Sequence, residues 1–288
     1  MRVAEVLKRA TVRLGEAGIR SPQLDAELIL SHLLGLERIN LHIYPEREIS
    51  REMCQKFWEK VEKREKRMPA QYIVNNQEFM GLDFWVEEGV LIPRPDTEIL
   101  VEKVIEIYQD HYGGKKLQIL DMGFGSGAIA ISLGKYIEEA MVFGVDISPK
   151  AFELAERNAL KHGVGDRVKF FQGDLFKGLE NANLQRAFDL IVSNPPYIKA
   201  DVLPTLGPEV RDYEPGLALD GGRDGLCFYR RILEGVGDFL NRDGWLAVEI
   251  GYDQGQAVKK MMADKGFANI GLVKDLAGLD RVVVGRLA

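Results

Sequence analysis

The sequence predicts an α/β protein in which a doubly wound, mostly parallel sheet follows a small helical bundle and ends in an antiparallel strand pair. Three features predict it. Apolar residues recur at helical spacing through residues 1–67, short β-type runs follow in residues 71–92, and strands alternate with helices from about residue 93. Such alternation is typical of a parallel sheet covered by helices. Ligands of these sheets bind at the carboxyl ends of the strands.

Composition and charge exclude several classes of protein. The chain has 288 residues, 46% of them hydrophobic, which is enough for a sizeable core and too many for a disordered protein. The net charge of −6 is not the basic excess that a protein needs to grip a nucleic-acid backbone. Residues 1–70 carry 14 Lys and Arg against 11 Asp and Glu, whereas the remainder carries 24 against 33. The basic first part is therefore a candidate docking face for a protein partner.

Membrane, disulfide and metal sites are not expected. The longest run without a charged residue, Met122–Gly134, is too short to cross a bilayer, and the first residues lack an apolar signal-peptide core. A soluble, cytoplasmic protein is expected. Cys54 and Cys227 lie far apart, and the four histidines are scattered, so neither a disulfide framework nor a metal site is expected.

The first part is predicted to hold three helices. Apolar residues recur every three or four positions from residue 3 to 14. A second helix begins after Ser21, a common N-cap followed here by proline at the first helical position, and ends at Gly35. A third begins near Ser50, and Pro69 ends the helical part.

A change of character marks residues 71–92. The runs Gln71–Val74, Glu78–Met80 and Leu82–Val86 have β-type composition, and Gly81 separates the last two. They predict a small β-hairpin that links two domains.

Apolar strands and amphipathic helices alternate over the rest of the chain. Pro93–Asp96 leads into a helix that stops at Gly113, and Asp224 is expected to cap a later helix. The last two strands are expected to form an antiparallel pair. Strands are predicted at residues 117–120, 141–145, 168–171, 188–192, 245–250, 270–274 and 281–284, and further helices at residues 127–139, 149–162, 224–240 and 254–265.

A glycine-rich loop, Asp121–Ala128, directly follows a predicted strand and opens a helix. Its glycines permit a tight turn and let the backbone approach a bound cofactor. Asp146, at the end of the next strand, fits an acceptor for the ribose hydroxyls of NAD and of S-adenosylmethionine alike. The loop alone indicates the two cofactors about equally, and a tight turn without a ligand is the weaker alternative.

Two further acids favour S-adenosylmethionine. Asp121 lies two residues before the first glycine, a position where methyltransferases often carry an acid, and Asp174 follows the third strand. Three acids at successive strand ends suit a ligand with hydroxyl, amino and sulfonium groups, and they would repel a pyrophosphate. The alternative for Asp174 is a helix N-cap or turn residue.

The most specific motif is Asn194-Pro195-Pro196-Tyr197, which follows the fourth strand. The two prolines fix the backbone and offer no N–H, so the Pro195 carbonyl is a fixed acceptor, and the Asn194 side-chain oxygen is a second one. Two acceptors side by side match the two N–H bonds of a planar –NH₂ group, and the Tyr197 ring can pack on it. The motif therefore indicates a clamp for an amide or an aromatic amine rather than only a rigid turn.

This motif and the glycine loop resemble those of S-adenosylmethionine-dependent amino methyltransferases. Three further segments resemble the HemK/PrmC family in particular: Pro93–Glu98, Tyr213–Leu226 and Asp275–Val282. The resemblance to this family extends over the whole chain. The sequence departs from the family's pattern at Phe124, Leu175 and Leu279, where a small polar residue, Trp and Arg are expected.

The resemblance implies a helical substrate-recognition domain at residues 1–70, a hairpin linker at residues 71–92 and a Rossmann-like class I methyltransferase domain at residues 93–288. It also implies methyl transfer from S-adenosylmethionine to N5 of the glutamine in the Gly-Gly-Gln motif of class I peptide chain release factors. These release factors are then the expected partners, without membrane or direct nucleic-acid binding.

The resemblance also implies a role for each site residue. Asn194, Pro195, Pro196 and Tyr197 bind the substrate amide, and Asn194, Pro195 and Tyr197 act in catalysis. Because no His, Cys or carboxylate is evidently placed as a base, catalysis by positioning and electrostatics is expected. The cofactor-binding residues are Gly123, Phe124, Gly125, Ser126, Gly127, Asp146, Asp174, Leu175 and Asn194.

Three alternatives remain open. A glutamine methyltransferase of the same family could act on a ribosomal protein. A DNA or RNA amino methyltransferase could clamp an adenine amine, although the acidic second part disfavours phosphate contacts. A cofactor-binding scaffold without activity is the third, and the complete Asn194–Tyr197 clamp disfavours it.

Overall fold

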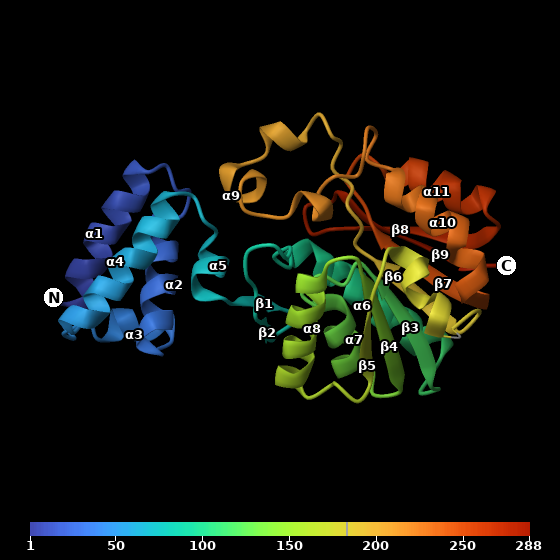
Figure 1. The fold of residues 1–288 in the computed structure, drawn as a ribbon, viewed down its shortest axis with the longest axis horizontal. Coiled ribbons are helices and arrows are strands. Elements are labelled where there is room, and N and C mark those ends of the chain that lie inside the picture. The colour runs from blue at the N-terminus through green and yellow to red at the C-terminus, as the bar shows by residue number, and fades with distance from the viewer. Residues whose placement is uncertain (183) are drawn as a thin grey trace. The chain divides into compact units, whose positions relative to one another are not determined.

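A computed structural model describes residues 1–182 and 184–288 of the chain. The chain divides into two units, shown in Figure 1. The helical unit contains Met1–Asn76 and Gly207–Tyr213, and the sheet unit contains Gln77–Leu206 and Glu214–Ala288. The chain therefore passes from one unit to the other at three places.

A seven-stranded sheet in the order β5-β4-β3-β6-β7-β9-β8 forms the centre of the sheet unit. The first five of these strands run parallel, β9 pairs antiparallel with β7, and β8 pairs antiparallel with β9. The strand order reverses between β3 and β6, which is where ligands bind in open sheets of this kind. The strands are β3 (Leu117–Met122), β4 (Ala140–Asp146), β5 (Val168–Gln172), β6 (Phe188–Ser193), β7 (Leu240–Glu249), β8 (Phe267–Lys274) and β9 (Asp280–Leu287).

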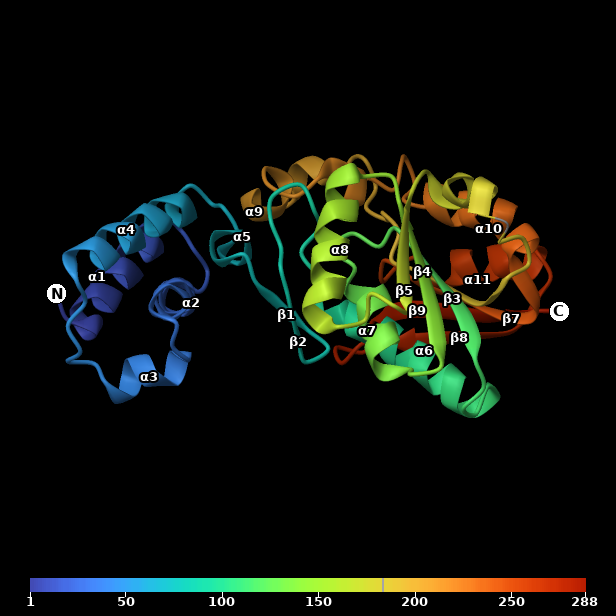
Figure 2. The same ribbon diagram turned by 60° about the horizontal axis from the view of Figure 1, so that its bottom comes forward.

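Helices cover both faces of this sheet, as Figures 1 and 2 show. Because side chains alternate along a strand, Ile119 of β3 packs with the core under one set of helices, whereas Leu120 packs with the core under the other. The first set is α6 (Glu98–His111), α7 (Ala128–Tyr136) and α8 (Pro149–His162), and the second is α10 (Cys227–Phe239) and α11 (Gly255–Asp264). The predicted doubly wound fold class is confirmed.

Short elements complete the sheet unit. The hairpin of β1 (Gln77–Phe79) and β2 (Leu82–Phe84) is antiparallel, as predicted. The remaining pieces are 3-10 turns, namely η1 (Pro95–Thr97), η2 (Leu175–Ala182), η3 (Leu203–Thr205) and η4 (Gly216–Ala218). No helix in the described part of the chain is long and apolar enough to span a bilayer.

The helical unit packs α1 (Val3–Glu16), α2 (Pro22–Leu34) and α4 (Arg51–Glu65) around an apolar core. The third helix begins near Ser50, as predicted, and the Ser50 side chain caps α4 by accepting a hydrogen bond from the Met53 N–H. Two short helices that the sequence analysis did not anticipate, α3 (Arg38–Ile43) and α9 (Pro208–Arg211), also belong to this unit.

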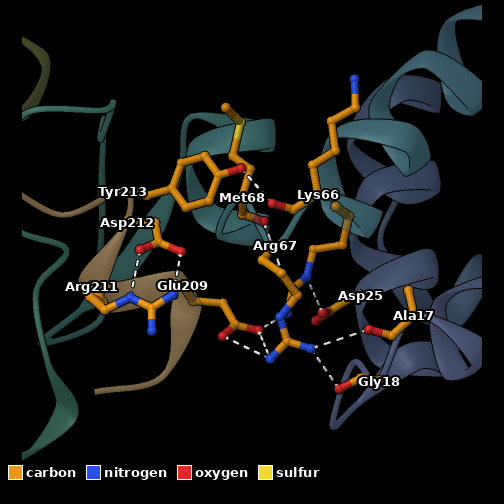
Figure 3. Close-up of polar contacts among 11 residues, drawn as sticks. Ala17, Gly18, Asp25, Lys66, Arg67, Met68, Glu209, Arg211, Asp212 and Tyr213 are labelled. Atoms are coloured by element: carbon orange, nitrogen blue, oxygen red, sulfur yellow. Dashed lines mark hydrogen bonds and ion pairs between the residues drawn. The ribbon is translucent and has the colours of Figure 1, made fainter. Parts of the chain in front are cut away.

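Glu209 of α9 is bound by two arginines of the helical unit (Figure 3). Arg64 Nη2 lies 3.2 Å from Glu209 Oε1, and Arg67 Nη2 lies 3.0 Å from Oε2. Arg64 Nε also donates to Asp25 Oδ2 at 2.7 Å and Arg67 Nη1 to the Gly18 carbonyl at 2.7 Å, whereas the buried Arg67 Nε has no hydrogen-bond partner among the described residues. The segment Gly207–Tyr213 is thus held by a shared, partly buried set of ion pairs.

Two sequence-based expectations are wrong. Gln71–Val74, expected as a strand, lies in the helix α5 (Ala70–Val74), and Pro69 is its N-cap rather than the end of the helical part. Tyr72, Ile73 and Val74 favour strands by propensity, but their burial outweighs that preference.

Asp224 does not cap α10, which begins at Cys227 after the N-cap Leu226. Its carboxylate instead accepts from the Leu226 N–H at 3.1 Å and pairs with Arg230. The segment before the helix is therefore a turn that Asp224 stabilises from its own side chain.

Candidate functional site

A cavity of about 360 Å³ lies at the carboxyl ends of β3, β4, β5 and β6, and all of its lining residues belong to the sheet unit. Most residues predicted from the sequence line it, whereas Gly127 and Tyr197 do not. Those that do are Gly123, Phe124, Gly125, Ser126, Asp146, Asp174, Leu175, Asn194, Pro195 and Pro196.

The glycines of the loop after β3 have positive φ angles of 78°, 53° and 82° at Gly123, Gly125 and Gly127. These angles strain any residue with a Cβ, so the loop conformation requires glycine. A Cβ on Gly123 would meet no atom within 4 Å, whereas one on Gly127 would lie 2.8 Å from Ile131 Cδ1. Gly123 thus leaves room at the cavity wall, and Gly127 serves the packing of α7.

Asp146 joins this loop to the end of β4. Its Oδ2 accepts the Gly125 N–H and its Oδ1 accepts the Ser148 N–H, each at 2.9 Å. Burial raises the pKa of Asp146, and the Ser148 and Gly125 hydrogen bonds oppose that effect. Each carboxylate oxygen keeps a free lone pair, so Asp146 can accept hydrogen bonds from a diol in the cavity.

Asp121 does not line the cavity. It is fully buried and its Oδ2 accepts the Ala130 N–H at 3.0 Å, which satisfies a free donor in the first turn of α7. Among the described residues, Oδ1 has no hydrogen-bond partner. Burial raises the pKa of Asp121 to about 8. The prediction that three acids at successive strand ends face the ligand is therefore wrong, because Asp146 and Asp174 are the only acids among the described residues that line the cavity.

Asp174 and Leu175 close the cavity at the end of β5. Asp174 Oδ2 accepts from Arg231 Nη2 at 2.6 Å, and Arg231 also lines the cavity. Leu175 has a φ of 52°, an uncommon conformation for a leucine. Arg231 lies on α10, and nothing in its sequence surroundings marks it as a site residue.

The Asn194–Tyr197 segment has a cavity side and an interior side. Asn194 lines the cavity, and its Nδ2 lies 3.0 Å from Thr97 Oγ1. Tyr197 faces the interior, where its hydroxyl donates to Glu249 Oε1 at 3.2 Å and its carbonyl accepts from Gln254 Nε2 at 3.0 Å. The segment is thus fixed by residues of η1 and β7 and by the N-cap residue of α11.

Glu249 is a buried acid at the end of β7, 1% exposed. Burial raises the pKa of Glu249 to about 7. Three groups partly oppose this effect and lower the pKa: the Thr97 side chain, the charge of Arg281 and the Tyr197 hydroxyl. Its Oε2 has no hydrogen-bond partner among the described residues. The sequence analysis missed Glu249, although an acid inside the apolar run Trp245–Ile250 was a usable signal.

The described residues contain no group of three or more His, Cys, Asp or Glu side chains arranged to hold a metal ion.

Comparison with known proteins gives matches over both units. A PrmC N-terminal domain family matches residues 5–74, and a methyltransferase domain family matches residues 114–272. A release factor glutamine methyltransferase of Geobacter sulfurreducens is 44% identical over 285 residues, which cover 99% of this chain and 96% of that protein. Proteins of the same name from Clostridium botulinum and Moorella thermoacetica are each 43% identical, covering 95% and 98% of this chain and 95% and 97% of theirs.

A solved structure of a methyltransferase from Pyrococcus furiosus is similar with a TM-score of 0.51 and 18% sequence identity. The similarity covers 72% of this chain and 90% of that one. At this identity the similarity supports the fold alone.

Proposed function

Because the chain belongs to the release factor glutamine methyltransferase family, we propose that it methylates N5 of the glutamine in the Gly-Gly-Gln motif of class I peptide chain release factors. S-adenosylmethionine is the methyl donor. The observation that carries the proposal is the pair of acceptors at the cavity wall, Asn194 and Pro195, which matches a primary amide. Release factors act on ribosomes, so this substrate implies a cytoplasmic reaction.

The cavity residues fit S-adenosylmethionine by their chemistry. This cofactor supplies a methyl group bound to a cationic sulfur. A cavity of about 360 Å³ lies in the range of small-molecule sites, and Asp146 offers its carboxylate to a ribose diol there. We assign the Gly123–Gly127 loop to the methionine part, Asp146 to the ribose, and Asp174 with Leu175 to the adenine.

Catalysis rests on positioning and electrostatics. An amide nitrogen is a weak nucleophile, because its lone pair is delocalised into the carbonyl. The Asn194 and Pro195 oxygens hold the two N–H bonds, aim the nitrogen and stabilise the positive charge that develops on it. The ring of Tyr197 does not line the cavity, so we assign Tyr197 to holding the segment from the interior rather than to stacking on the amide.

The helical unit is the proposed docking face for the release factor. It exposes three apolar side chains close together in sequence on and after α3: Ile39, Ile43 and Tyr44 are 57%, 56% and 59% exposed. Such side chains are enriched at protein interfaces. In the full-length chain, Ile43→Ser with Tyr44→Ser is expected to raise KM for the release factor and leave KM for S-adenosylmethionine unchanged. Val12→Ser, at a 55% exposed position of α1, is the control.

One experiment tests the reaction. The protein is incubated with isotopically labelled S-adenosylmethionine and, in parallel, with a release factor, ribosomal proteins and DNA, and mass spectrometry locates the added methyl group. Methylated glutamine in the Gly-Gly-Gln motif is the expected result, and Asn194→Ala is the matched inactive control. Label in a ribosomal protein alone would identify the alternative substrate, and label in nucleic acid alone would overturn the proposal.

A further inference from the structure

The clamp works only if the Asn194 side chain is turned the right way. A side-chain amide carries an acceptor oxygen and a donor nitrogen on one planar group. Only the orientation with Oδ1 toward the cavity offers an acceptor to a substrate –NH₂. The opposite orientation would place two donors against each other, so the orientation of this amide decides between a working and a blocked clamp.

The contact with Thr97 does not set this orientation alone. Thr97 is 4% exposed, and its Oγ1 lies 3.0 Å from Asn194 Nδ2. A hydroxyl can accept a hydrogen bond from Nδ2, but it can equally donate one to Oδ1 if the amide turns over. A further group must fix the direction in which the Thr97 hydroxyl hydrogen points.

Glu249 is that group. An ionised carboxylate only accepts hydrogen bonds. Its Oε1 accepts from the Tyr197 hydroxyl at 3.2 Å, and its buried Oε2 is an unfilled acceptor among the described residues. The buried Thr97 side chain lowers the pKa of this carboxylate, and the unfilled Oε2 is an acceptor toward which the Thr97 hydroxyl hydrogen can point. With its hydrogen directed to Glu249, Thr97 has only lone pairs left for Asn194.

We propose that Glu249 is a positioning residue, which acts through Thr97 to hold Asn194 Oδ1 toward the substrate amide. The same carboxylate holds the Tyr197 hydroxyl, so one buried acid fixes both ends of the Asn194–Tyr197 segment. The inference rests on the proposed function, since it assigns Asn194 Oδ1 to an amide substrate. The inference also gives a role to Thr97, which belongs to the Pro93–Glu98 motif.

The chain of hydrogen bonds from Glu249 through Thr97 to Asn194, here called the relay, has a direction that depends on pH. The groups that face Glu249 are Thr97, Tyr197, Arg281 and Asp96, and Tyr229 donates to its backbone carbonyl. With a pKa of about 7, Glu249 is ionised above neutral pH and carries a hydrogen below it. A protonated carboxyl can donate to Thr97 and reverse the relay. The kcat is therefore expected to rise with pH through about 7.

Variants of Thr97 test the relay directly. Thr97→Val keeps the shape and removes the hydroxyl, so kcat should fall by about tenfold to a hundredfold, as expected for a misdirected catalytic group, with unchanged affinity for S-adenosylmethionine. Thr97→Ser restores the hydroxyl and should recover most of the rate. Thr205→Val, an exposed threonine of the same unit, is the matched control. A wild-type kcat in Thr97→Val would overturn the proposal.

Glu249→Gln is nearly isosteric and tests the acid. Its amide can donate as well as accept, so the direction of the relay is no longer set. The kcat should fall, and the rise of kcat through pH 7 should disappear. If the variant keeps that rise, another group causes it and the assignment of the relay to Glu249 fails.

A measurement without methyl transfer separates this inference from the proposed function. Hydrogen exchange of the Asn194 side-chain NH₂, followed by NMR, should be slower in the wild type than in Thr97→Val, because Nδ2 is bonded to Thr97. Equal exchange rates would overturn the relay whatever the substrate is. An exchange difference in a protein that methylates no release factor would overturn the proposed function and retain the orientation of Asn194.

Discussion

Gly125 donates its backbone N–H to Asp146 Oδ2 at 2.9 Å. The carboxylate that is assigned to the ribose therefore also fixes the conformation of the loop that is assigned to the methionine part. Loss of this side chain removes an acceptor from the cavity and a support from the loop at the same time.

Asp146→Ala should weaken binding of S-adenosylmethionine at least tenfold, about 1.4 kcal/mol. The reason is the loss of both the diol acceptor and the Gly125 and Ser148 hydrogen bonds. Isothermal titration calorimetry measures the affinity, and Asp166→Ala, at an exposed position, is the control. Unchanged affinity would remove Asp146 from the cofactor site.

Asn194→Ala should lower kcat by roughly 10²–10³, the usual effect of deleting one group that stabilises charge in a transition state. Cofactor affinity should persist, because Asp146 and the glycine loop are untouched. Single-turnover kinetics with a release factor substrate measures the effect. A near-normal rate would exclude Asn194 as an acceptor for the amide.

Asp121→Asn should change how stability depends on pH. Burial raises the pKa of Asp121 from its ordinary value to about 8 in the folded protein. The folded state thus holds a proton that the unfolded state has already lost, so this group makes stability fall as pH rises toward 8. Urea unfolding between pH 5 and 9 should show a smaller fall in the variant than in the wild type. The exposed Asp201→Asn should retain the wild-type slope.

Glu209→Gln should release the segment Gly207–Tyr213 from the helical unit. Burial alone would raise the pKa of Glu209, but its backbone N–H, Arg67 and Arg64 lower it overall. Its contribution to stability is therefore present above the ordinary carboxyl pKa and is lost as pH falls through the lowered value.

Hydrogen exchange of residues 207–213 should be faster in this variant. The free energy of local opening should fall by about 1–2 kcal/mol, as expected for the loss of a partly buried ion pair. Asp212→Asn is the matched control, since Asp212 lies in the same segment and pairs with the exposed neighbour Arg211. Equal protection in both variants would show that the two arginines do not hold the segment.

The sequence predicted the fold where periodicity is strong. The alternation after residue 93 gave the order of strands and helices, because each element is long enough to show its period. α5 was missed, because the burial of Tyr72 and Ile73 overrides their preference for strands.

The sequence predicted the parts of the site that are local motifs. The Gly123–Gly127 loop and Asn194–Tyr197 are each continuous, and their chemistry can be argued from spacing alone. Thr97, Glu249 and Arg231 come from distant parts of the chain, and the closed packing of the sheet unit brings them to the site. The same limit applies to Asp121, whose burial follows from the direction of its side chain beneath α7.

The return of the chain to the helical unit at Gly207–Tyr213 bears on how such proteins can be recombined. A chimera that takes only residues 1–76 from a relative would combine the helices of one protein with α9 of the other. The arginines at positions 64 and 67 would then come from one protein and the glutamate at position 209 from the other. The unit that must be exchanged as a whole is therefore discontinuous in sequence, Met1–Asn76 with Gly207–Tyr213. Its two pieces should be exchanged together, and substitutions at Arg64, Arg67 and Glu209 should be correlated among relatives.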